Sequence, residues 1–436
     1  MENHVLLDSK AITKIQSIIL ISIIIVGGVA AYILLGSEDQ SSETIKIGIC
    51  ADLDMSRGPE MLNGAKLAAE EINAEGGVLG RHIEIIAEDS DIEDAQLDTS
   101  KAVLALTRLI TYHNVDFVIV GGGEDFIIDS AVVHKKIIFG ALSPSDSLTQ
   151  RVIDNYDKYK YFFRLAVNQT TFNTLVIDSL KVLREITGFN KIAYIGLDVP
   201  QVKGIAENLD YYLPEVYNFD LVYRGFCPWG TVDFSSYFAA AEAAGAEIMV
   251  PLLVNQEGLI LVKEWYDRQS PMVVWGMNVF SSLDSGWNAS EGKVEHTTGL
   301  ASSALQLGYP ATAKTLVTQN ALFDRWGTFP TLQAVATYDT VRFVIPDAIE
   351  RAGTIETEVV IGALEETNIE TSLEENLKFT SSHDHYFSSA STTAITMMFQ
   401  WQENGTKAIV FPKEIMEETG ATYTYPPWLG PWENIS

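Results

Sequence analysis

Only a few residue patterns in this 436-residue chain are of types that could perform chemistry. Gly121-Gly122-Gly123 follows an apolar run, and the backbone N–H groups of a glycine-rich turn after a strand can bind phosphate. The run lacks both GxGxxG spacing and a Lys-Ser/Thr pair, so a tight turn at the end of a strand is the favoured interpretation. The hydrolase and redox motifs GxSxG, HExxH and CxxC are absent from the sequence, and we identify no catalytic residue.

Two further patterns contain metal-binding or charged side chains. His383-Asp384-His385 could supply metal ligands, but only seven His and two Cys occur in the chain and no third ligand lies nearby in sequence. A polar turn is therefore the favoured interpretation, and we predict neither a metal nor a cofactor. Arg57 is expected at the end of the first strand, where it could contact an anionic ligand or bridge acidic neighbours.

The charge balance excludes one large class of ligands. The chain carries 58 Asp and Glu against 29 Lys and Arg, a formal net charge of −29. Such a surface repels nucleic acid and anionic lipid headgroups, so we predict no nucleic-acid partner. Cys50 and Cys227 lie far apart in the sequence, and two buried thiols are favoured over a disulfide.

The N-terminal segment has the properties of a membrane anchor. Residues 15–36 are uncharged and mainly apolar, which matches the ~20 residues that a helix needs to cross a bilayer. The stretch is longer than the ~7–15 apolar residues of a signal peptide, so we favour a transmembrane helix over a cleaved signal. Lys10 and Lys14 precede it, which predicts residues 1–14 in the cytoplasm and the rest outside, in the extracellular or periplasmic space. Residues 37–44 are polar and are expected to form a linker.

The elements that must position these residues follow from the hydrophobic pattern. Short β-branched runs predict strands, and apolar residues every three or four positions predict helices. Strands are expected at 45–51, 83–87, 115–120, 137–139, 161–165, 191–196, 221–226, 247–252 and 272–275. Helices are expected at 59–75, 95–113, from 126, and at 170–187, 202–213, 234–244 and 256–268. This alternation predicts an α/β fold with two tandem arrays, each forming a parallel sheet covered by helices on both faces.

The last third of the chain has a different composition. Helices are expected at 311–326, 331–352 and 358–366, followed by strands at 392–402 and 407–411 that form a hairpin around Asn404-Gly405. In open α/β sheets ligands bind at the carboxyl ends of the strands. Two such sheets facing one another would therefore form one cleft, suited to hinge closure on a small molecule.

Several short motifs carry a resemblance to a known family. Asn63-Gly64-Ala65, Ala69-Glu70-Glu71-Ile72-Asn73 and Gly76-Gly77-Val78-Leu79-Gly80-Arg81 occur together near the start of the first array. Asp233-Phe234-Ser235 and Tyr338-Asp339-Thr340 extend the pattern along the chain. With these motifs the chain closely resembles branched-chain amino acid ABC transporter substrate-binding proteins of the leucine-binding type.

This resemblance implies a type 1 periplasmic binding fold, with two Rossmann-like lobes joined by three crossovers. We expect the crossovers near Leu165, Leu300 and His385. The expected lobes are 45–165 with 300–385 (lobe 1), and 166–299 with 386–436 (lobe 2). The resemblance also implies a receptor without enzymatic activity, which captures a small-molecule ligand such as an amino acid and delivers it to an ABC transporter permease.

In lobe 1 the ligand loops depart from those of the relatives. Where leucine-binding members carry a Ser pair for the ligand carboxylate, this chain has Gly122, Gly123 and Glu124. The glycines still expose backbone N–H groups, whereas Glu124 would oppose a carboxylate or favour a cation. The next loop offers the hydroxyl groups of Ser143 and Ser145 as ligand contacts.

In lobe 2 the expected ligand contacts are Gln201, Asn255 and Asn278. The first two occupy positions that are often aromatic in the relatives, and Asn278 stands where the relatives have the acid that pairs with the ligand ammonium. Asn can donate or accept a hydrogen bond but cannot offset a charge. The resemblance thus leaves amino acids, amides and ureas open as ligands.

Two other classes of function remain open alongside a transport receptor. One is a sensory ectodomain of the same fold that acts with a signalling partner, and it is disfavoured because no signalling domain follows the second lobe in this sequence. The other is an enzyme that uses the cleft. Convergence of two or more titratable side chains there would favour an enzyme, but the expected cleft residues are mostly Gly, Ser, Gln and Asn.

Overall fold

The first array forms a five-stranded parallel sheet. The computed structural model describes residues 44–54, 57–91, 99–141, 145–301, 304–327, 329–386 and 397–429. The strand order is β2-β1-β3-β4-β5. These strands are β1 (Ile45–Ala51), β2 (Ile83–Asp89), β3 (Phe117–Val120), β4 (Ile137–Gly140) and β5 (Phe162–Arg164). Every residue of β3 and β4 is buried, as expected for central strands of a parallel sheet covered on both faces.

Helix α2 (Arg57–Ala74) covers one face of this sheet through an apolar stripe. Met61, Ala65, Ala68 and Ile72 recur at helical spacing and all four are buried, as the sequence predicts. The other helices that follow these strands are α3 (Ser100–Thr111), α4 (Glu124–Val132), α5 (Asp146–Asp154) and α6 (Tyr156–Tyr159).

A long helix from the last third of the chain also packs on this sheet. It consists of α14 (Leu332–Asp339), the π-helical turn η2 (Thr340–Val344) and α15 (Ile345–Ala352), and α16 (Thr357–Glu365) follows it. The prediction of one helix at 331–352 is thus confirmed, apart from the π turn. Pro346 lacks a backbone N–H and cannot donate to the preceding turn, which accounts for an irregular hydrogen-bond ladder at this point.

The second array forms a second parallel sheet with the order β10-β8-β6-β7, and β9 also pairs with β8. Its strands are β6 (Lys191–Leu197), β7 (Asp220–Cys227), β8 (Ile248–Leu253), β9 (Val273–Val274) and β10 (Met277–Asn278). Its helices are α7 (Gln169–Thr187), α8 (Pro200–Glu215), α9 (Ser235–Ala243), α10 (Glu257–Arg268), α11 (Val279–Ser282) and α12 (Gly286–Ala289).

A separate antiparallel sheet shares the hydrophobic core of the second parallel sheet. It has the order β11-β12-β13, with β11 (Thr298–Ala301), β12 (Met397–Trp401) and β13 (Lys407–Phe411), and α17 (Lys413–Thr419) follows. The predicted hairpin around Asn404-Gly405 is confirmed, and both residues have the left-handed backbone conformation that this turn requires. The predicted residues 392–396 of its first strand lie outside the described residues.

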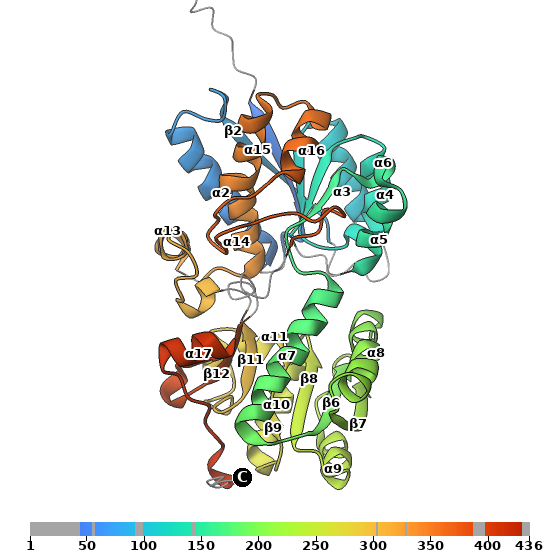
Figure 1. Cartoon of the computed structure of the whole chain (residues 1–436), viewed down its shortest axis with the longest axis vertical. Helices are drawn as coiled ribbons and strands as arrows, with labels where there is room; N and C mark the ends of the chain where they lie inside the picture. Colours follow the sequence, from blue (N-terminus) through green and yellow to red (C-terminus); the bar gives the residue numbers. More distant parts are fainter. Residues whose placement is uncertain are drawn as a thin grey trace, which may run out of the picture.

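Each of the two parallel sheets has its own hydrophobic core. One cluster of buried side chains surrounds the first sheet, and another surrounds the second sheet together with β11, β12 and β13. Figure 1 shows two lobes stacked along the long axis of the molecule, with α7 running from their junction along the second lobe. The predicted α/β fold with parallel sheets is confirmed.

The segment after β11 contributes to both cores. It contains η1 (Ala304–Leu307) and α13 (Thr315–Trp326), followed by α14. Leu305 and Val335 pack in the second-lobe core, whereas Leu322 and Tyr338 pack in the first-lobe core. This segment therefore joins the lobes through apolar contacts, and the crossover expected near Leu300 falls inside β11.

Two predictions about the whole chain can be compared with the described residues. Cys50 in β1 and Cys227 in β7 are both buried and are not joined in a disulfide, which confirms the prediction of two buried thiols. Among the described residues no helix is both long and apolar enough to cross a membrane. The predicted anchor at 15–36 lies outside the described residues.

Candidate functional site

The carboxyl ends of the first sheet carry the glycine turn that the sequence singled out. Gly122 and Gly123 connect β3 to α4, with φ values of 144° and 71°. These are conformations that L side chains rarely adopt, which explains why glycine stands here. Gly123 is the N-cap of α4 and Glu124 is its first residue, so the N–H groups of the first turn lie at the end of β3. A backbone anion site is thus chemically possible here.

Ser145 follows β4 and has a structural role in the next helix. Its hydroxyl oxygen accepts a hydrogen bond from Ser147 N–H at 3.2 Å and caps α5. Its carbonyl oxygen accepts a hydrogen bond from Arg164 Nη2 at 2.8 Å. Ser143, which the sequence paired with it, lies outside the described residues.

The position of Arg57 differs from the prediction. We expected Arg57 at the end of the first strand, but β1 ends at Ala51 and Arg57 is instead the first residue of α2. The loop between them turns the chain sharply: a Cβ at Gly58 would lie 1.8 Å from the carbonyl oxygen of Asp52. The strand itself matches the predicted 45–51, and the difference is that α2 begins at Arg57, two residues before the helix start expected at Pro59.

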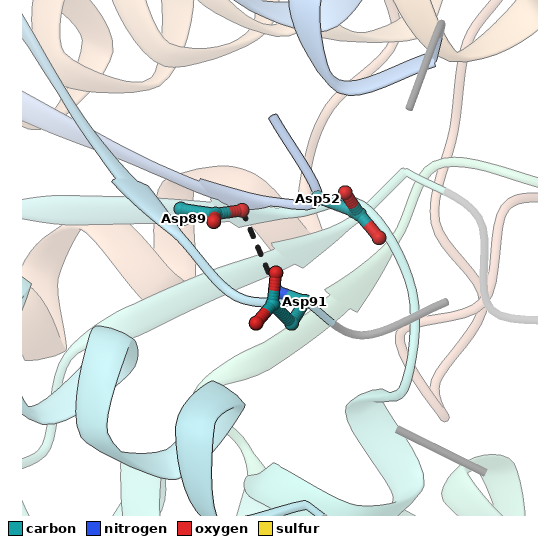
Figure 2. Close-up of side chains that lie close together, drawn as sticks. All are labelled: Asp52, Asp89 and Asp91. Atoms are coloured by element: carbon teal, nitrogen blue, oxygen red, sulfur yellow. Dashed lines mark hydrogen bonds between the residues drawn. The ribbon is translucent and has the colours of Figure 1, made fainter. Parts of the chain in front are cut away.

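Three carboxylates gather at the same edge of the sheet. Asp52 follows β1, Asp89 ends β2, and Asp91 follows it, with oxygens of all three within 4.8 Å of one another (Figure 2). Asp89 accepts hydrogen bonds from the N–H groups of Leu53 at 2.9 Å and of Asp91 at 3.5 Å. Hydrogen bonding from Lys101 lowers the pKa of Asp91. These carboxylates order the two loops, and the cluster alone does not define a metal site.

In the second lobe, Asn278 has structural contacts. Its side chain is 1% exposed. Its Nδ2 donates to the carbonyl oxygen of Gly258 at 2.9 Å, and its Oδ1 accepts from Ser281 N–H at 3.4 Å, which caps α11. Asn278 therefore joins the end of β10 to the start of α10. Its amide is occupied by protein partners, and a role toward a ligand remains a prediction.

Asn255 lies in a different environment, after β8, where it lines a pocket of about 330 Å³. The pocket lies between the turn after β7 and the start of α10. Its lining includes Trp229, Val232, Asn255, Gln256, Glu257 and Ile260. Gln201, the third predicted contact in this lobe, is the second residue of α8, after β6. Gln201 and Asn255 thus follow β6 and β8, and Asn278 ends β10, so all three lie at the carboxyl ends of this sheet.

Glu257 is a functional candidate that sequence reasoning missed. It is the first residue of α10 and is only 4% exposed. Its Oε1 accepts a hydrogen bond from Gly230 N–H at 2.6 Å, and its Oε2 is buried without a hydrogen-bond partner. Burial raises the pKa of the nearby Cys227 thiol to about 11, and the Glu257 charge acts in the same direction. From the sequence, Glu257 resembles any acid in the first turn of a helix.

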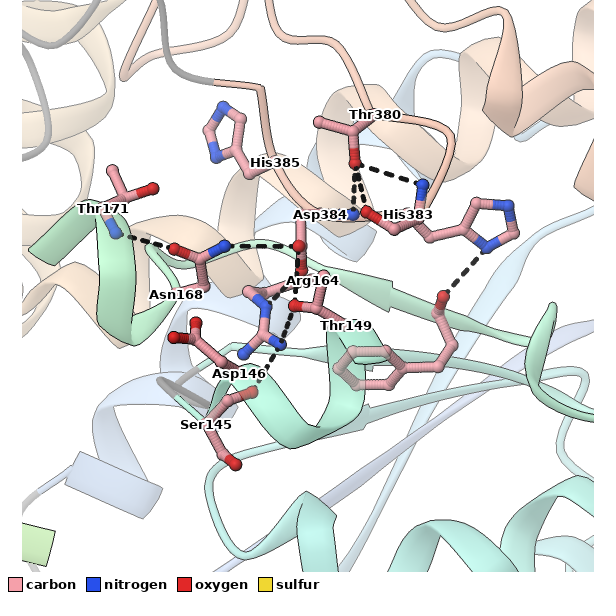
Figure 3. Close-up of polar contacts among 12 residues, drawn as sticks. Ser145, Asp146, Thr149, Arg164, Asn168, Thr171, Thr380, His383, Asp384 and His385 are labelled. Carbon is pink, nitrogen blue, oxygen red and sulfur yellow. Dashed lines mark hydrogen bonds and ion pairs between the residues drawn. The ribbon is translucent and has the colours of Figure 1, made fainter. Parts of the chain in front are cut away.

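A buried polar network joins the end of β5 and the start of α7 to residues 380–385, the segments where we expected the first and third crossovers (Figure 3). Arg164 ends β5 and is fully buried, and its Nε lies 2.6 Å from Oδ1 of Asp384. The second carboxylate oxygen of Asp384 accepts from Thr149 Oγ1 at 2.7 Å and from Asn168 Nδ2 at 3.3 Å. Asn168 is the N-cap of α7, so one carboxylate binds residues at the end of β5 and at the start of α7.

The two histidines beside Asp384 point in different directions (Figure 3). His383 Nδ1 lies 3.1 Å from the carbonyl oxygen of Phe162, and its Nε2 lies 3.0 Å from Glu365. His385 Nδ1 lies 3.1 Å from the carbonyl oxygen of Leu165, and the ring pairs with Glu374. The favoured interpretation of a polar turn agrees with these contacts, because each ring lies within hydrogen-bond distance of a backbone carbonyl oxygen, Phe162 in β5 or Leu165 directly after it.

Curated proteins with a similar sequence cover part of this chain. It is 24% identical over 220 residues to the Leu/Ile/Val-binding protein homolog 7 of Brucella abortus (strain 2308), which is 48% of this chain and 51% of that protein. The protein of the same name from Brucella suis biovar 1 (strain 1330) is 25% identical over 219 residues, with the same coverage. The chain thus matches about half the length of these relatives.

Solved structures with a similar fold cover most of the chain. A Silicibacter pomeroyi protein described as a branched-chain amino acid ABC transporter has a TM-score of 0.77 at 18% identity, over 88% of this chain and 100% of that one. A substrate-binding protein from Streptococcus pneumoniae in complex with isoleucine has a TM-score of 0.65 at 19% identity, over 84% of this chain and 100% of that one. A solute-binding protein from R. palustris in complex with benzoate has a TM-score of 0.65 at 12% identity, over 84% of this chain and 95% of that one. At such identities the likeness shows the fold alone.

A family model gives the broadest match. The model for periplasmic binding protein matches residues 44–406, from the start of β1 to the turn before β13. This range covers both parallel sheets and all three expected crossovers. The resemblance to branched-chain amino acid ABC transporter substrate-binding proteins predicted from the sequence is thereby confirmed. The chain belongs to the periplasmic binding protein family.

Proposed function

We propose that this chain captures a small polar ligand, such as an amino acid, amide or urea, between its two lobes and delivers it to an ABC transporter permease. The observation that carries the proposal is the short connection from β5 to α7. The carboxyl end of β5 leads directly into α7, and Thr170 of α7 still binds Asp146 of the first lobe through its Oγ1 at 2.7 Å. This contact supports the proposal, because ligands of open α/β sheets bind at the carboxyl ends of the strands, and here that edge of the first sheet adjoins the start of α7.

The lobes of this proposal comprise 45–165 with 300–385, and 166–299 with 386–436. Ligand first meets lobe 1 at the Gly122–Glu124 turn, with Ser143, Ser145 and Arg57 as further contacts. Lobe 2 then closes by a hinge motion and brings Gln201, Asn255 and Asn278 to the ligand. Asn278 can take part only if it exchanges its present hydrogen bonds with Gly258 and Ser281 for the ligand.

Tethering to the cell membrane completes the proposal. The apolar stretch at 15–36 acts as a single-pass anchor and holds both lobes outside the cytoplasm, next to the permease. A tether raises the effective concentration of the loaded receptor at its permease without any additional contact between them.

Titration calorimetry tests the binding step. The purified full-length chain is titrated with the standard amino acids, their amides, urea and ureas that carry short alkyl groups. We expect at least one of these solutes to bind with one-to-one stoichiometry, and small-angle scattering to show a more compact particle once it is bound. If no member of the panel binds, a receptor for small polar solutes is contradicted.

A further inference from the structure

The surroundings of the buried Glu257 carboxylate satisfy only one of its two oxygens. One oxygen is bound by Gly230 N–H, but the other has no hydrogen-bond partner, and no ion pair to Glu257 is present among the described residues. Burial of a carboxylate is unfavourable unless cations or hydrogen-bond donors replace the water that it loses. The start of α10 supplies a partial positive charge, which compensates it only in part.

The pocket that Glu257 lines is suited to a particular kind of ligand. Trp229, Val232 and Ile260 provide apolar surface, while Asn255 and Gln256 provide amide groups. In the part of the chain that the structure describes, no Lys, Arg or His lines this pocket. No basic side chain of the pocket lining would therefore compete with a cationic ligand for the carboxylate. Trp229 is 57% exposed at the turn that covers Glu257, and an indole face can also attract a cation. The complementary group is a protonated amine on an apolar body.

The pocket also lies beside the position where the sequence lacks an expected acid. Asn278 stands at that position, and its Nδ2 binds the carbonyl oxygen of Gly258, the residue that follows Glu257. The carboxylate of Glu257 thus emerges from the neighbouring strand end, after β8 rather than β10. The negative charge that position 278 does not supply is present one loop away.

We propose that Glu257 is the residue that binds the ligand ammonium, and that the solute is an amine with an apolar or aromatic side chain. This inference rests on the proposed solute-binding function and names the chemical class of its ligand. The turn around Trp229 moves outward to admit the amine to Oε2 and then packs its indole ring against the apolar part of the ligand. Asn255 binds the polar end of the same molecule.

Three probes on the full-length wild-type chain test the inference directly. L-leucine carries both charged groups, 3-methylbutylamine keeps the ammonium on a similar body, and 4-methylpentanoate keeps only the carboxylate. Calorimetry should show that the two amines bind. The affinity for 4-methylpentanoate should be lower than that for L-leucine by about tenfold or more. Binding of 4-methylpentanoate as tightly as L-leucine, or failure of both amines to bind, overturns the inference.

A pair of matched variants provides the second measurement. Glu264 lies two turns along α10 and also accepts a backbone N–H from the same loop, with its Oε2 2.7 Å from Phe234 N, but it does not line the pocket. Glu257→Gln should weaken L-leucine binding about tenfold or more without lowering the melting temperature, whereas Glu264→Gln should leave affinity within about twofold. Equal effects of the two substitutions on affinity overturn the inference.

The outcomes separate this inference from the function on which it rests. If an amide, urea or carboxylate binds and the Glu257→Gln variant binds it equally well, the receptor function stands and the inference is wrong. If no solute of either panel binds to the folded wild-type chain, both the receptor function and the inference are contradicted. Folding is checked in each case by the thermal unfolding transition of the same sample.

Discussion

Asp339 is a carboxyl group whose surroundings change its protonation. It is 2% exposed, and burial raises its pKa to about 7, although Ser372 Oγ at 2.6 Å and two backbone N–H groups donate hydrogen bonds to it. The unfolded chain has an Asp pKa near 3.9. Between about pH 4 and pH 7 the folded state therefore binds this proton more tightly, and stability falls as pH rises through that window.

Substitution of Asp339 by Asn should remove this dependence. We compare the unfolding free energy of the wild type with that of Asp339→Asn at each pH. The difference should change by on the order of 2–4 kcal/mol between pH 4 and pH 8, to the disadvantage of the wild type, because only the wild type has the Asp339 carboxyl group that ionises in this range. Urea unfolding at a series of pH values measures the difference. Asp233→Asn serves as control, since hydrogen bonds from Ser235 lower the pKa of Asp233 and its contribution falls below that window. A difference that stays constant with pH would contradict the assignment.

The residues of the candidate site could be predicted from the sequence only in part. The tight turn at Gly122 and Gly123 was predictable because glycine is the residue that readily adopts the positive φ values of such a turn. The engagement of Asn278 was not, since its partner Gly258 lies 20 residues earlier in the chain and is brought near only by the pairing of β8 with β10. Glu257 carries no local signal of burial, because the turn at Gly230 that covers it comes from another strand end.

At the scale of elements, strands were easier to predict than the starts of helices. β1 coincides with the predicted 45–51, and β6 extends the predicted 191–196 by one residue, because an apolar β-branched run is a local signal. Helix α13 begins at Thr315 instead of the expected 311. The hydroxyls of Thr312 and Thr315 donate to the carbonyl oxygens of Thr371 and Ser372 at 2.8 Å, so distant residues set this start.

The contact between α2 and α14 depends on a residue without a side chain. A Cβ at Gly64 would lie 2.4 Å from the carbonyl oxygen of Ala334, a backbone atom that cannot rotate away. Gly64→Ala should therefore lower the unfolding free energy by about 1–3 kcal/mol, as the helices separate to accommodate the methyl group. Gly362 in α16 is a matched control, because a Cβ added there would meet no described atom within 4 Å.

Gly362→Ala should have the opposite effect, a gain of roughly 0.5–1 kcal/mol, because Ala is the better helix former and no clash arises. Urea denaturation of both variants under one set of conditions gives the comparison. Equal responses of the two variants would mean that helix propensity, and not the approach of α14, decides the effect at position 64.

At the scale of the whole molecule, two segments where we expected crossovers are joined by groups that lie far apart in sequence. The expectation of a crossover near Leu165 and another near His385 rested on a resemblance and on a polar turn. Neither could reveal that Arg164 and Asp384 pair across 220 residues, because the partner of a buried charge is determined by the folded topology. One carboxylate orients β5, α5 and the start of α7 at the junction of the lobes.

Removal of this carboxylate should be costly for that reason. Asp384→Ala leaves the fully buried Arg164 guanidinium without its counter-ion, and we expect a loss of about 3–5 kcal/mol in unfolding free energy. The exposed pair between Lys413 and Glu185 is the control, and Glu185→Gln should cost less than about 1 kcal/mol. Both are measured by urea denaturation of the full-length chain.

A double variant separates the charge pair from the rest of the network. Arg164→Leu combined with Asp384→Leu removes both buried charges, so it should be more stable than Asp384→Ala alone, even though Thr149 and Asn168 lose their acceptor. The ligand-free double variant should also show a broader distribution of lobe orientations by small-angle scattering, because this carboxylate then no longer links the first crossover to the third. A double variant as unstable as Asp384→Ala, with wild-type scattering, would mean that backbone and apolar contacts alone hold the lobes in place.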